Sequence, residues 1–459
     1  MTTQYDAIII GTGQAGPSLA GRLNAAGKRA AVIERQLVGG SCVNVGCIPT
    51  KALVASARVA HVARRAADFG IQITGPVEVD MAQVHARMKK IAGQSSSGLT
   101  DWIQGMDHVD LIRGHAQFVG PNAVEVDGKR LEAPQIFINV GGRASVPGIP
   151  GLETVDYMTS TGILELATLP KHLMIIGGSY IGLEFAQIFR RFGSEVTVVE
   201  QGPRLISRDD PDVSQSVLEI LESEGIRVRL NAAGIQVRPE GPQIAVQATY
   251  DGVQKDVIGT HLLVATGRMA NTDSLGLSAA GIKANERGFI QVDDQLQTNV
   301  PGIWAMGDCN GRGAFTHTSY NDYEIVAANL LDSDPRRVSD RISCYGLYID
   351  PPLGRVGMTE RDARESGRKV LVGKFPMSRV GRARERSETD GFIKILVDAD
   401  TEEILGAAVL GINGDEVVQS LLVAMYAKAP YTVLSRAVLI HPTVSELLPT
   451  TLQNLVPLE

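Results

Sequence analysis

Cysteine and aromatic residues are scarce in this chain. Its 459 residues include 4 cysteines and 2 tryptophans, and aromatic residues make up 5% of the total. The scarcity fits a reducing compartment, where a disulfide is more often catalytic than structural.

Long apolar runs and a large excess of either charge are also missing. No apolar stretch approaches the roughly 20 residues of a membrane span. Residues 1–6 lead directly into the strand-like run Ala7-Ile8-Ile9-Ile10, without the parts of a signal peptide. A net charge of -7 argues against sequence-independent binding of nucleic acid or an anionic membrane. We therefore expect a cytoplasmic protein of about three domains that binds neither nucleic acid nor membrane.

Two of the four cysteines stand close together, Cys42 and Cys47, in the run GGSCVNVGCIPTK over residues 39–51. Their spacing can close a small disulfide ring if the backbone bends between them. The alanine-rich stretch that follows predicts a helix, so Cys47 lies near a helix N-terminus, where the helix dipole stabilises a thiolate. Lys51 follows four residues later and would add its positive charge on the same face if the helix starts early.

Two other interpretations of this pair are unrelated buried thiols and half of a zinc site. Zinc needs about four ligands, and Cys309 and Cys344 stand far apart without ligand spacing. We therefore predict a redox-active disulfide and no metal site, and assign no role to Cys309 or Cys344.

An internal repeat organises the first half of the chain. A buried strand runs into a glycine-rich turn, a helix and a second short strand that closes on an acid, and this order occurs twice. The first copy has Gly11, Gly13, Gly16 and Glu34, and the second has Gly177, Ser179, Gly182 and Glu200. Each acid follows the first glycine of its copy by the same number of residues, close to the offset of about 20 that dinucleotide-binding folds use. Two matching copies predict two such folds, each with a pyrophosphate at a helix N-terminus.

With these motifs the chain resembles the class I pyridine nucleotide-disulfide oxidoreductases, the family of lipoamide dehydrogenase, glutathione reductase and mercuric reductase. The resemblance covers essentially the whole chain. It is carried by GGSCVNVGCIPTK at 39–51, GGSYIGLEFA at 177–186, VATGR at 264–268, IWAMGD at 303–308 and HPTVSE at 441–446.

The resemblance implies an α/β protein with two Rossmann-like dinucleotide-binding domains, one for FAD and one for NAD, and a C-terminal α/β dimerisation domain. The motif order places the FAD domain at 1–148 and 269–338, the NAD(P) domain at 149–268 and the interface domain at 339–459. It also implies a homodimer whose active sites are shared between subunits.

The same resemblance assigns the cofactor-binding residues. FAD would be held by Gly11, Gly13, Gly16, Glu34, Gly40, Lys51, Ala116, Gly307 and Asp308. The nicotinamide cofactor would be held by Gly177, Ser179, Tyr180, Gly182, Glu200 and Gly267. Tyr180 resembles an aromatic gate over the flavin, and its alternative interpretation is a half-buried aromatic. Glu200 favours NADH because a carboxylate repels a 2'-phosphate, while Arg204 and Arg208 nearby keep NADPH as the alternative.

The catalytic residues that the resemblance implies are Cys42 and Cys47, the ion pair of Lys51 with Glu184 beside the flavin, and a dyad of His441 with Glu446. The dyad would reach into the partner subunit and move the proton of the exchanging thiol. Without the resemblance, the spacing of 443–446 is that of a capping box, so Glu446 could instead cap a helix.

We therefore predict a flavin-dependent NAD(P)H oxidoreductase that passes electrons from NADH through FAD to the Cys42–Cys47 disulfide and on to a small disulfide, metal or oxidant substrate. Several segments, among them 157–162 and 351–360, are closest to a mercuric-reductase-like, RclA-type branch. Dihydrolipoyl dehydrogenase and mercuric reductase are the alternatives, although the tail 447–459 lacks the cysteine pair of mercuric reductases. A structural subunit of a dehydrogenase complex and a redox sensor are hypotheses outside this class; a sensor would not need His441 and Glu446.

Overall fold

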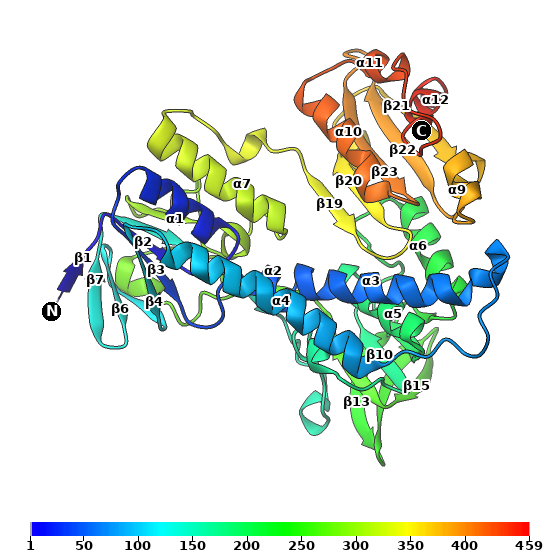
Figure 1. The fold of residues 1–459 in the computed structure, drawn as a ribbon, viewed down its shortest axis with the longest axis horizontal. Coiled ribbons are helices and arrows are strands. Elements are labelled where there is room, and N and C mark those ends of the chain that lie inside the picture. The colour runs from blue at the N-terminus through cyan, green and yellow to red at the C-terminus, as the bar shows by residue number, and fades with distance from the viewer. Residues whose placement is uncertain (1, 459) are drawn as a thin grey trace.

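The first copy of the repeat forms a five-stranded parallel sheet at the N-terminal end of the molecule (Figure 1). The structure is a computed structural model and describes residues 2–458. The strand order is β18-β8-β2-β3-β4, with bounds Ile303–Ala305, Gln135–Ile138, Ala7–Ile10, Ala30–Glu34 and Val109–Arg113. The strands β2 and β3 are buried along their whole length, as expected for a parallel sheet covered on both faces. Strand β18 joins this sheet only after the second fold has been completed.

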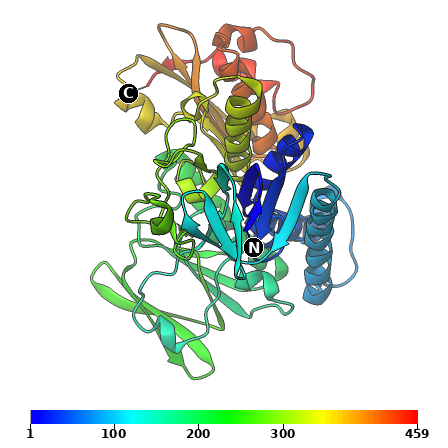
Figure 2. The same cartoon turned by 90° about the vertical axis from the view of Figure 1, so that its left-hand side faces the viewer.

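Helices and a second small sheet cover this core. The helices are α1 (Ala15–Ala25), α2 (Gly40–Val45), α3 (Cys47–Arg64), α4 (Met81–Gln104) and α7 (Thr316–Ala327). The small sheet has the order β1-β7-β6-β5, with bounds Thr2–Gln4, Lys129–Glu132, Ala123–Val126 and Ala116–Gly120. Figure 2 looks onto this end of the molecule, where the small sheet lies beside the N-terminus.

The second copy forms a four-stranded parallel sheet. Its order is β12-β11-β10-β16, with bounds Arg227–Arg229, Glu195–Val199, His172–Ile176 and His261–Val264. The helices α5 (Tyr180–Phe192) and α6 (Pro211–Ser223) follow its strands, and an antiparallel sheet of β13 (Ala233–Glu240), β14 (Gln243–Tyr250) and β15 (Val253–Gly259) extends from it. The antiparallel pair β9 (Gly142–Ala144) and β17 (Arg268–Ala270) connects the two folds. We propose the domain boundaries near 148 and 268 on this basis.

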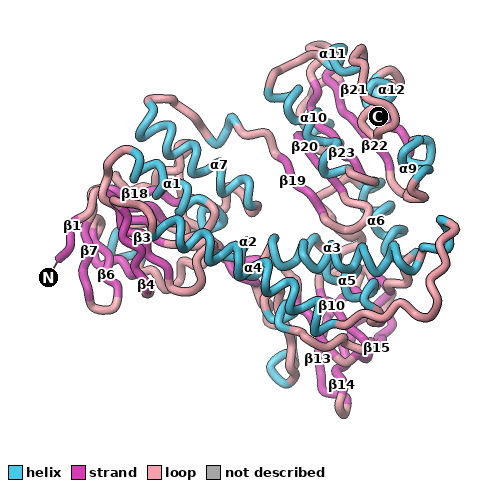
Figure 3. Tube along the Cα trace, viewed as in Figure 1, coloured by secondary structure: helices cyan, strands magenta, loops and turns pink. Residues whose placement is uncertain are grey.

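The C-terminal part is a six-stranded antiparallel sheet with helices (Figure 3). Its order is β19-β20-β23-β22-β21-β24, with bounds Cys344–Leu347, Leu353–Gly357, Ile404–Leu410, Phe392–Asp398, Val370–Pro376 and Val456–Pro457. Its helices are α8 (Glu360–Glu365), α9 (Gly381–Glu385), α10 (Gly414–Tyr426), α11 (Tyr431–Ser435) and α12 (Leu447–Leu452). The two Rossmann-like folds and this third part confirm the predicted fold class.

Helices α3 and α5 pack together and are joined by one carboxylate of the third part. Asp350 forms ion pairs with Arg58 of α3 at 2.6 Å and with Arg191 of α5 at 2.5 Å. Arg191 is nearly buried and also pairs with Glu224 at 2.7 Å. All three parts of the fold therefore meet at Asp350. Among the helices that the structure describes, none combines the length and the apolar character that crossing a bilayer requires.

Candidate functional site

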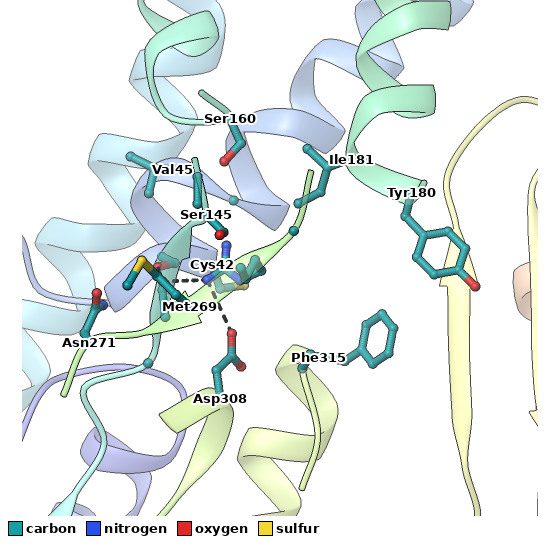
Figure 4. A pocket seen from close by; sticks show the side chains of 18 of the residues that line it. Cys42, Val45, Ser145, Ser160, Tyr180, Ile181, Met269, Asn271, Asp308 and Phe315 are labelled. Carbon is teal, nitrogen blue, oxygen red and sulfur yellow. Dashed lines mark hydrogen bonds and ion pairs between the residues drawn. The ribbon is translucent and has the colours of Figure 1, made fainter. Parts of the chain in front are cut away.

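One large cavity lies where the two nucleotide-type folds meet. Its volume is about 1890 Å³, and its lining includes both glycine-rich turns, Cys42, Cys47, Lys51 and residues of the segment 311–319. Figure 4 shows part of the lining, with Cys42 near the centre and Tyr180 and Phe315 to one side. The motifs that lie far apart in the sequence thus share one space.

The first glycine of each copy has the same geometry. Gly11 has φ +100°, and a Cβ there would lie 2.3 Å from the carbonyl oxygen of Asn139. Gly177 has φ +115°, and a Cβ there would lie 2.5 Å from the carbonyl oxygen of Ala265. Any other residue would be strained by its φ and would clash with backbone. The two copies therefore repeat the same backbone conformation and the same close approach to a carbonyl, and both features require glycine.

The acid of each copy is held against its own turn. The carboxylate of Glu34 accepts hydrogen bonds from the backbone N–H and the hydroxyl of Thr12. The carboxylate of Glu200 accepts from the backbone N–H groups of Gly178 at 2.6 Å and Gly202 at 2.7 Å. Thr12 and Gly178 occupy the same place in the two copies, directly after the first glycine. Both acids line the cavity, where they can reach a ribose.

Most of the predicted cofactor-binding residues line the cavity, and three glycines lie behind its wall. The lining includes Gly13, Gly40, Ala116, Ser179 and Gly267. Gly16, Gly182 and Gly307 are absent from it. Gly16 and Gly182 instead let their helices approach the first glycine of each copy, because a Cβ on either would lie within 2.4 Å of that glycine's carbonyl oxygen. Their contribution is to shape the turn.

Asp308 reaches the cavity from the end of the first sheet. Its carboxylate lies 3.3 Å from the guanidinium of Arg268, which also donates to the carbonyl of Gly142 at 2.6 Å (Figure 4). Burial raises the pKa of Asp308, while Arg268 opposes that shift. The adjoining Gly307 is fixed from below, because its N–H donates to the buried carboxylate of Asp322 at 2.7 Å.

The two cysteines of the motif face each other across a helix junction. Cys42 lies on α2, and Cys47 is the first residue of α3, so the helix begins before the alanine-rich stretch that predicted it. Both are free thiols in the structure. A hydrogen bond from Cys42, the hydroxyl of Thr316 at 3.1 Å and the charge of Lys51 together lower the pKa of Cys47 to about 6. The Cys42 thiol, with its pKa raised, stays protonated and donates. Cys47 is therefore the thiolate of the pair.

Lys51 and Glu184 form the predicted ion pair. Lys51 Nζ lies 2.7 Å from Glu184 Oε2, and the carboxylate is 7% exposed. The ammonium also lies over the ring of Tyr348 at 4.5 Å, and the other oxygen of Glu184 accepts from the backbone N–H of Tyr348 at 3.0 Å. Cys47 and Lys51 both belong to α3, so the helix starts early enough for the two side chains to share one face, as predicted.

Tyr180 lines the cavity at the first position of α5 and is half-buried. Its hydroxyl donates to Asp209 at 2.7 Å, and in Figure 4 the ring points away from Cys42. Neither of its two sequence interpretations named this partner.

His441 and Glu446 are paired but lie outside the cavity of their own chain. His441 Nδ1 lies 2.8 Å from Glu446 Oε2, and the His441 side chain is 80% exposed. Helix α12 starts at residue 447, and the Glu446 side chain makes no capping hydrogen bond to it. The carboxylate orients the imidazole, while the backbone N–H of Glu446 donates to Thr443 Oγ1 at 3.2 Å, which is one half of the capping box that the spacing predicts. The exposed nitrogen of His441 is free to face a second subunit.

Comparison with known proteins decides the family. Residues 5–322 match the family described as pyridine nucleotide-disulphide oxidoreductase, and residues 344–452 match its dimerisation domain. The chain belongs to the pyridine nucleotide-disulphide oxidoreductases. The resemblance drawn from the sequence motifs is confirmed.

This oxidoreductase is similar along most of its length to three differently named proteins. It is 38% identical over 451 residues to the probable pyridine nucleotide-disulfide oxidoreductase RclA of Escherichia coli, covering 96% of this chain and 97% of that protein. It is 36% identical to a dihydrolipoyl dehydrogenase of Thermus scotoductus, covering 96% and 95%. It is 35% identical to a mercuric reductase of Lysinibacillus sphaericus, covering 92% and 77%.

Solved structures agree with these matches. The oxidoreductase superposes with a TM-score of 0.90 at 36% identity on the Cu(II) complex of the HOCl-induced flavoprotein disulfide reductase RclA from Escherichia coli, covering 98% of this chain and 99% of that one. It is therefore a flavin-dependent enzyme of the FAD- and NAD(P)H-using kind, and its dimerisation domain supports a homodimer. The two glycine turns and their acids, opening into a single cavity, fit two dinucleotides.

Sequence reasoning missed several residues of this site. They are Thr316 beside the thiols, Tyr348 over Lys51, Asp322 under Gly307, and Asn139, which accepts from the N–H of Gly16 and donates to the carbonyl of Met306. Each acts over a long sequence separation and has no local motif. Cys309 is buried with a pKa raised to about 12, which makes it a packing residue, and Cys344 lines the cavity.

Proposed function

We propose that NADH delivers electrons through FAD to the Cys42–Cys47 pair and that the dithiol then reduces a small disulfide or a thiol-reactive metal ion. The observation that carries this is the place of Cys47, a stabilised thiolate at the start of α3 in the same cavity as both dinucleotide turns. A thiolate held by a helix N-terminus, a hydroxyl and an ammonium is suited to open and close a disulfide.

The cofactor sites follow the two copies of the repeat. FAD would bind along Gly11, Gly13, Glu34 and Asp308, and NADH along Gly177, Ser179 and Glu200. When bound, the flavin would take hydride from the nicotinamide and pass an electron pair to the disulfide. Lys51, held by Glu184, would place a positive charge where negative charge develops.

The chain's own residues then manage the sulfur chemistry. Two electrons break the bond between Cys42 and Cys47, leaving Cys47 as the thiolate while Cys42 takes one proton. In the second half-reaction the Cys42 thiol gives that proton to His441 of the partner subunit and attacks a disulfide substrate. The substrate S–S bond breaks, which leaves a mixed disulfide on Cys42 and expels the first substrate thiolate. Cys47 displaces the substrate thiolate from Cys42, and the imidazole returns the proton to that leaving thiolate. The two electrons of the dithiol have then moved to the substrate, and the bond between Cys42 and Cys47 has formed again. Glu446 holds the imidazole in the orientation that this requires.

The proposal extends to the physiological electron acceptor. The Escherichia coli RclA structure was solved as a Cu(II) complex of an HOCl-induced reductase, which supports an oxidant or copper ion as acceptor here. With Cu(II) each dithiol would reduce two ions to Cu(I). Dihydrolipoyl dehydrogenase activity is the second candidate, favoured by the His441–Glu446 pair because a disulfide substrate needs a proton carrier.

Anaerobic reduction by NADH tests the electron path. The wild type should develop a long-wavelength charge-transfer absorbance from the Cys47 thiolate. Cys42→Ser should retain a thiolate band without needing reduction, and Cys47→Ser should lose it. A band that survives in Cys47→Ser would overturn the assignment of the two sulfurs.

Substrate choice is tested on the same preparation. Comparing kcat/KM should favour NADH over NADPH because of Glu200, and a tenfold preference for NADPH would contradict this. A panel of lipoamide, glutathione disulfide, Cu(II), Hg(II) and quinones should show Cu(II) reduced fastest, with rapid lipoamide turnover supporting the second candidate instead.

A further inference from the structure

Two tyrosines from different parts of the fold share one buried carboxylate beside the cavity. Tyr180 of α5 donates to Asp209 Oδ2 at 2.7 Å, and Tyr345 of β19 donates to Asp209 Oδ1 at 3.1 Å. The two rings lie 5.6 Å apart at an angle of 51°. Asp209 is 4% exposed and belongs to the segment before α6. We call these three residues the tyrosine clamp.

Besides their bonds to Asp209, the two phenols of the clamp also form a side-chain hydrogen bond with each other. Burial raises the pKa of Asp209, and its hydrogen bonds from Tyr180 and the charge of Arg355 oppose that rise. The pKa values of Tyr180 and Tyr345 are raised by burial, so both phenols stay protonated and donate. Next to it, Asp210 is fixed by a buried ion pair with Arg355 at 2.8 Å. The carboxylate is therefore anchored on a rigid segment.

Aromatic stacking continues from the clamp to the thiols. The ring of Phe315 stacks on Tyr345 at 5.6 Å and 10°, and the ring of His317 stacks on Phe315 at 5.5 Å and 9°. Thr316, between those two residues, lies 3.1 Å from Cys47. The position of Tyr180 is thus set by elements that also set the surroundings of the thiolate.

The clamp holds the Tyr180 ring on the β19 side of the cavity. Figure 4 shows the ring turned away from Ile181, Ser145 and Cys42, with its hydroxyl at the far side. Tyr180 directly follows Ser179 in the turn of the second copy, so a released ring could swing into the space next to that turn. That space is where the proposed nicotinamide site lies.

We propose that Asp209, aided by Tyr345, is a positioning residue that keeps Tyr180 out of the nicotinamide path. This rests on the proposed function, because it assumes that the nicotinamide cofactor binds at the 177–182 turn. A freed ring would compete with the nicotinamide, so loss of the clamp should weaken cofactor binding.

Calorimetric binding of NAD⁺ to the oxidised FAD-loaded enzyme tests the clamp without turnover. Asp209→Asn and Tyr180→Phe should each raise the Kd by about three- to tenfold, as expected for loss of a buried hydrogen bond. The double variant Asp209→Asn with Tyr180→Phe should have a Kd for NAD⁺ no higher than that of the single variant with the higher Kd, because both substitutions break the same hydrogen bond. Tyr345→Phe should give a smaller rise of the same sign.

The Tyr180→Ala background is the decisive control. There the ring is gone, so adding Asp209→Asn should leave the Kd unchanged. If Asp209→Asn still weakens binding in that background, Asp209 acts on the fold and not through Tyr180, and the inference is wrong. It is equally wrong if Asp209→Asn and Tyr180→Phe are without effect or additive. Failure of the wild type to bind NAD⁺ would instead overturn the proposed function, so the two failures are distinguishable.

Discussion

The hydroxyl of Thr316 offers the sharpest test of how the thiolate is stabilised. Its oxygen lies 3.1 Å from Cys47 Sγ, and a Thr316→Val substitution removes the hydroxyl while keeping the shape of the side chain. A hydrogen bond to a charged group is worth about 1.5 to 3 kcal/mol, and one pKa unit corresponds to about 1.4 kcal/mol. Because Cys47 is exposed, water replaces part of the lost bond, and we expect a rise of about half to one unit.

The sign of the pH effect follows from the lowered pKa. The Cys47 thiolate is favoured above its pKa of about 6 and is lost as pH falls through that value. In Thr316→Val the loss should occur at higher pH. Thiolate ultraviolet absorbance and the charge-transfer band of the reduced enzyme, titrated over pH, measure both proteins.

Thr316→Ser is the matched control for this experiment. It restores the hydroxyl and should return the pKa of Cys47 to that of the wild type. If the valine variant titrates like the wild type, the hydrogen bond contributes nothing and the thiolate depends on Cys42 and Lys51 alone. If the serine variant is shifted as far as the valine variant, packing and not hydrogen bonding is responsible.

Two further outcomes are expected. His441→Gln should slow the reduction of a disulfide substrate by about 10²- to 10⁴-fold while leaving reduction by NADH unchanged, as rapid mixing of each half-reaction would show, and equal slowing of both halves would contradict the dyad's role. Lys394→Met should lower the free energy of unfolding by about 3 to 5 kcal/mol, because the 2% exposed ammonium lies within 2.9 Å of Asp210, Asp212 and Glu360. In denaturant titrations the exposed control Lys369→Met should change the free energy of unfolding by less than about 1 kcal/mol. A similar loss in both variants would contradict the expectation that the buried ion-pair cluster makes Lys394 more costly to replace.

The local motifs allowed the fold to be predicted because they report local constraints. Gly11 and Gly177 need a positive φ next to a neighbouring carbonyl, and such a need leaves a glycine in the sequence. The strands before them, β2 and β10, are short apolar runs, and β2 has the same bounds, Ala7–Ile10, as the strand-like run in the sequence.

The surroundings of the site could not be predicted in the same way. Thr316 contacts Cys47 across 269 residues of sequence, and Asp209 meets Tyr345 across 136. A threonine, an aspartate and a tyrosine in those places are ordinary surface or loop residues until the fold brings them together. The role of Glu446 was ambiguous for a related reason, since a helix cap and a histidine partner use the same residue types at the same spacing.

The carboxylate of Asp350 connects the C-terminal part to the two helices that begin at the cavity. Helices α3 and α5 begin at the cavity with Cys47 and Tyr180, and each contacts Asp350 through an arginine further along, Arg58 and Arg191. The two arginines stand at matching positions, about 16 Å from the starts of their helices. The C-terminal part therefore fixes the helix that starts with Cys47 and the helix that starts with Tyr180 relative to each other, at a point well away from the cavity ends of both helices.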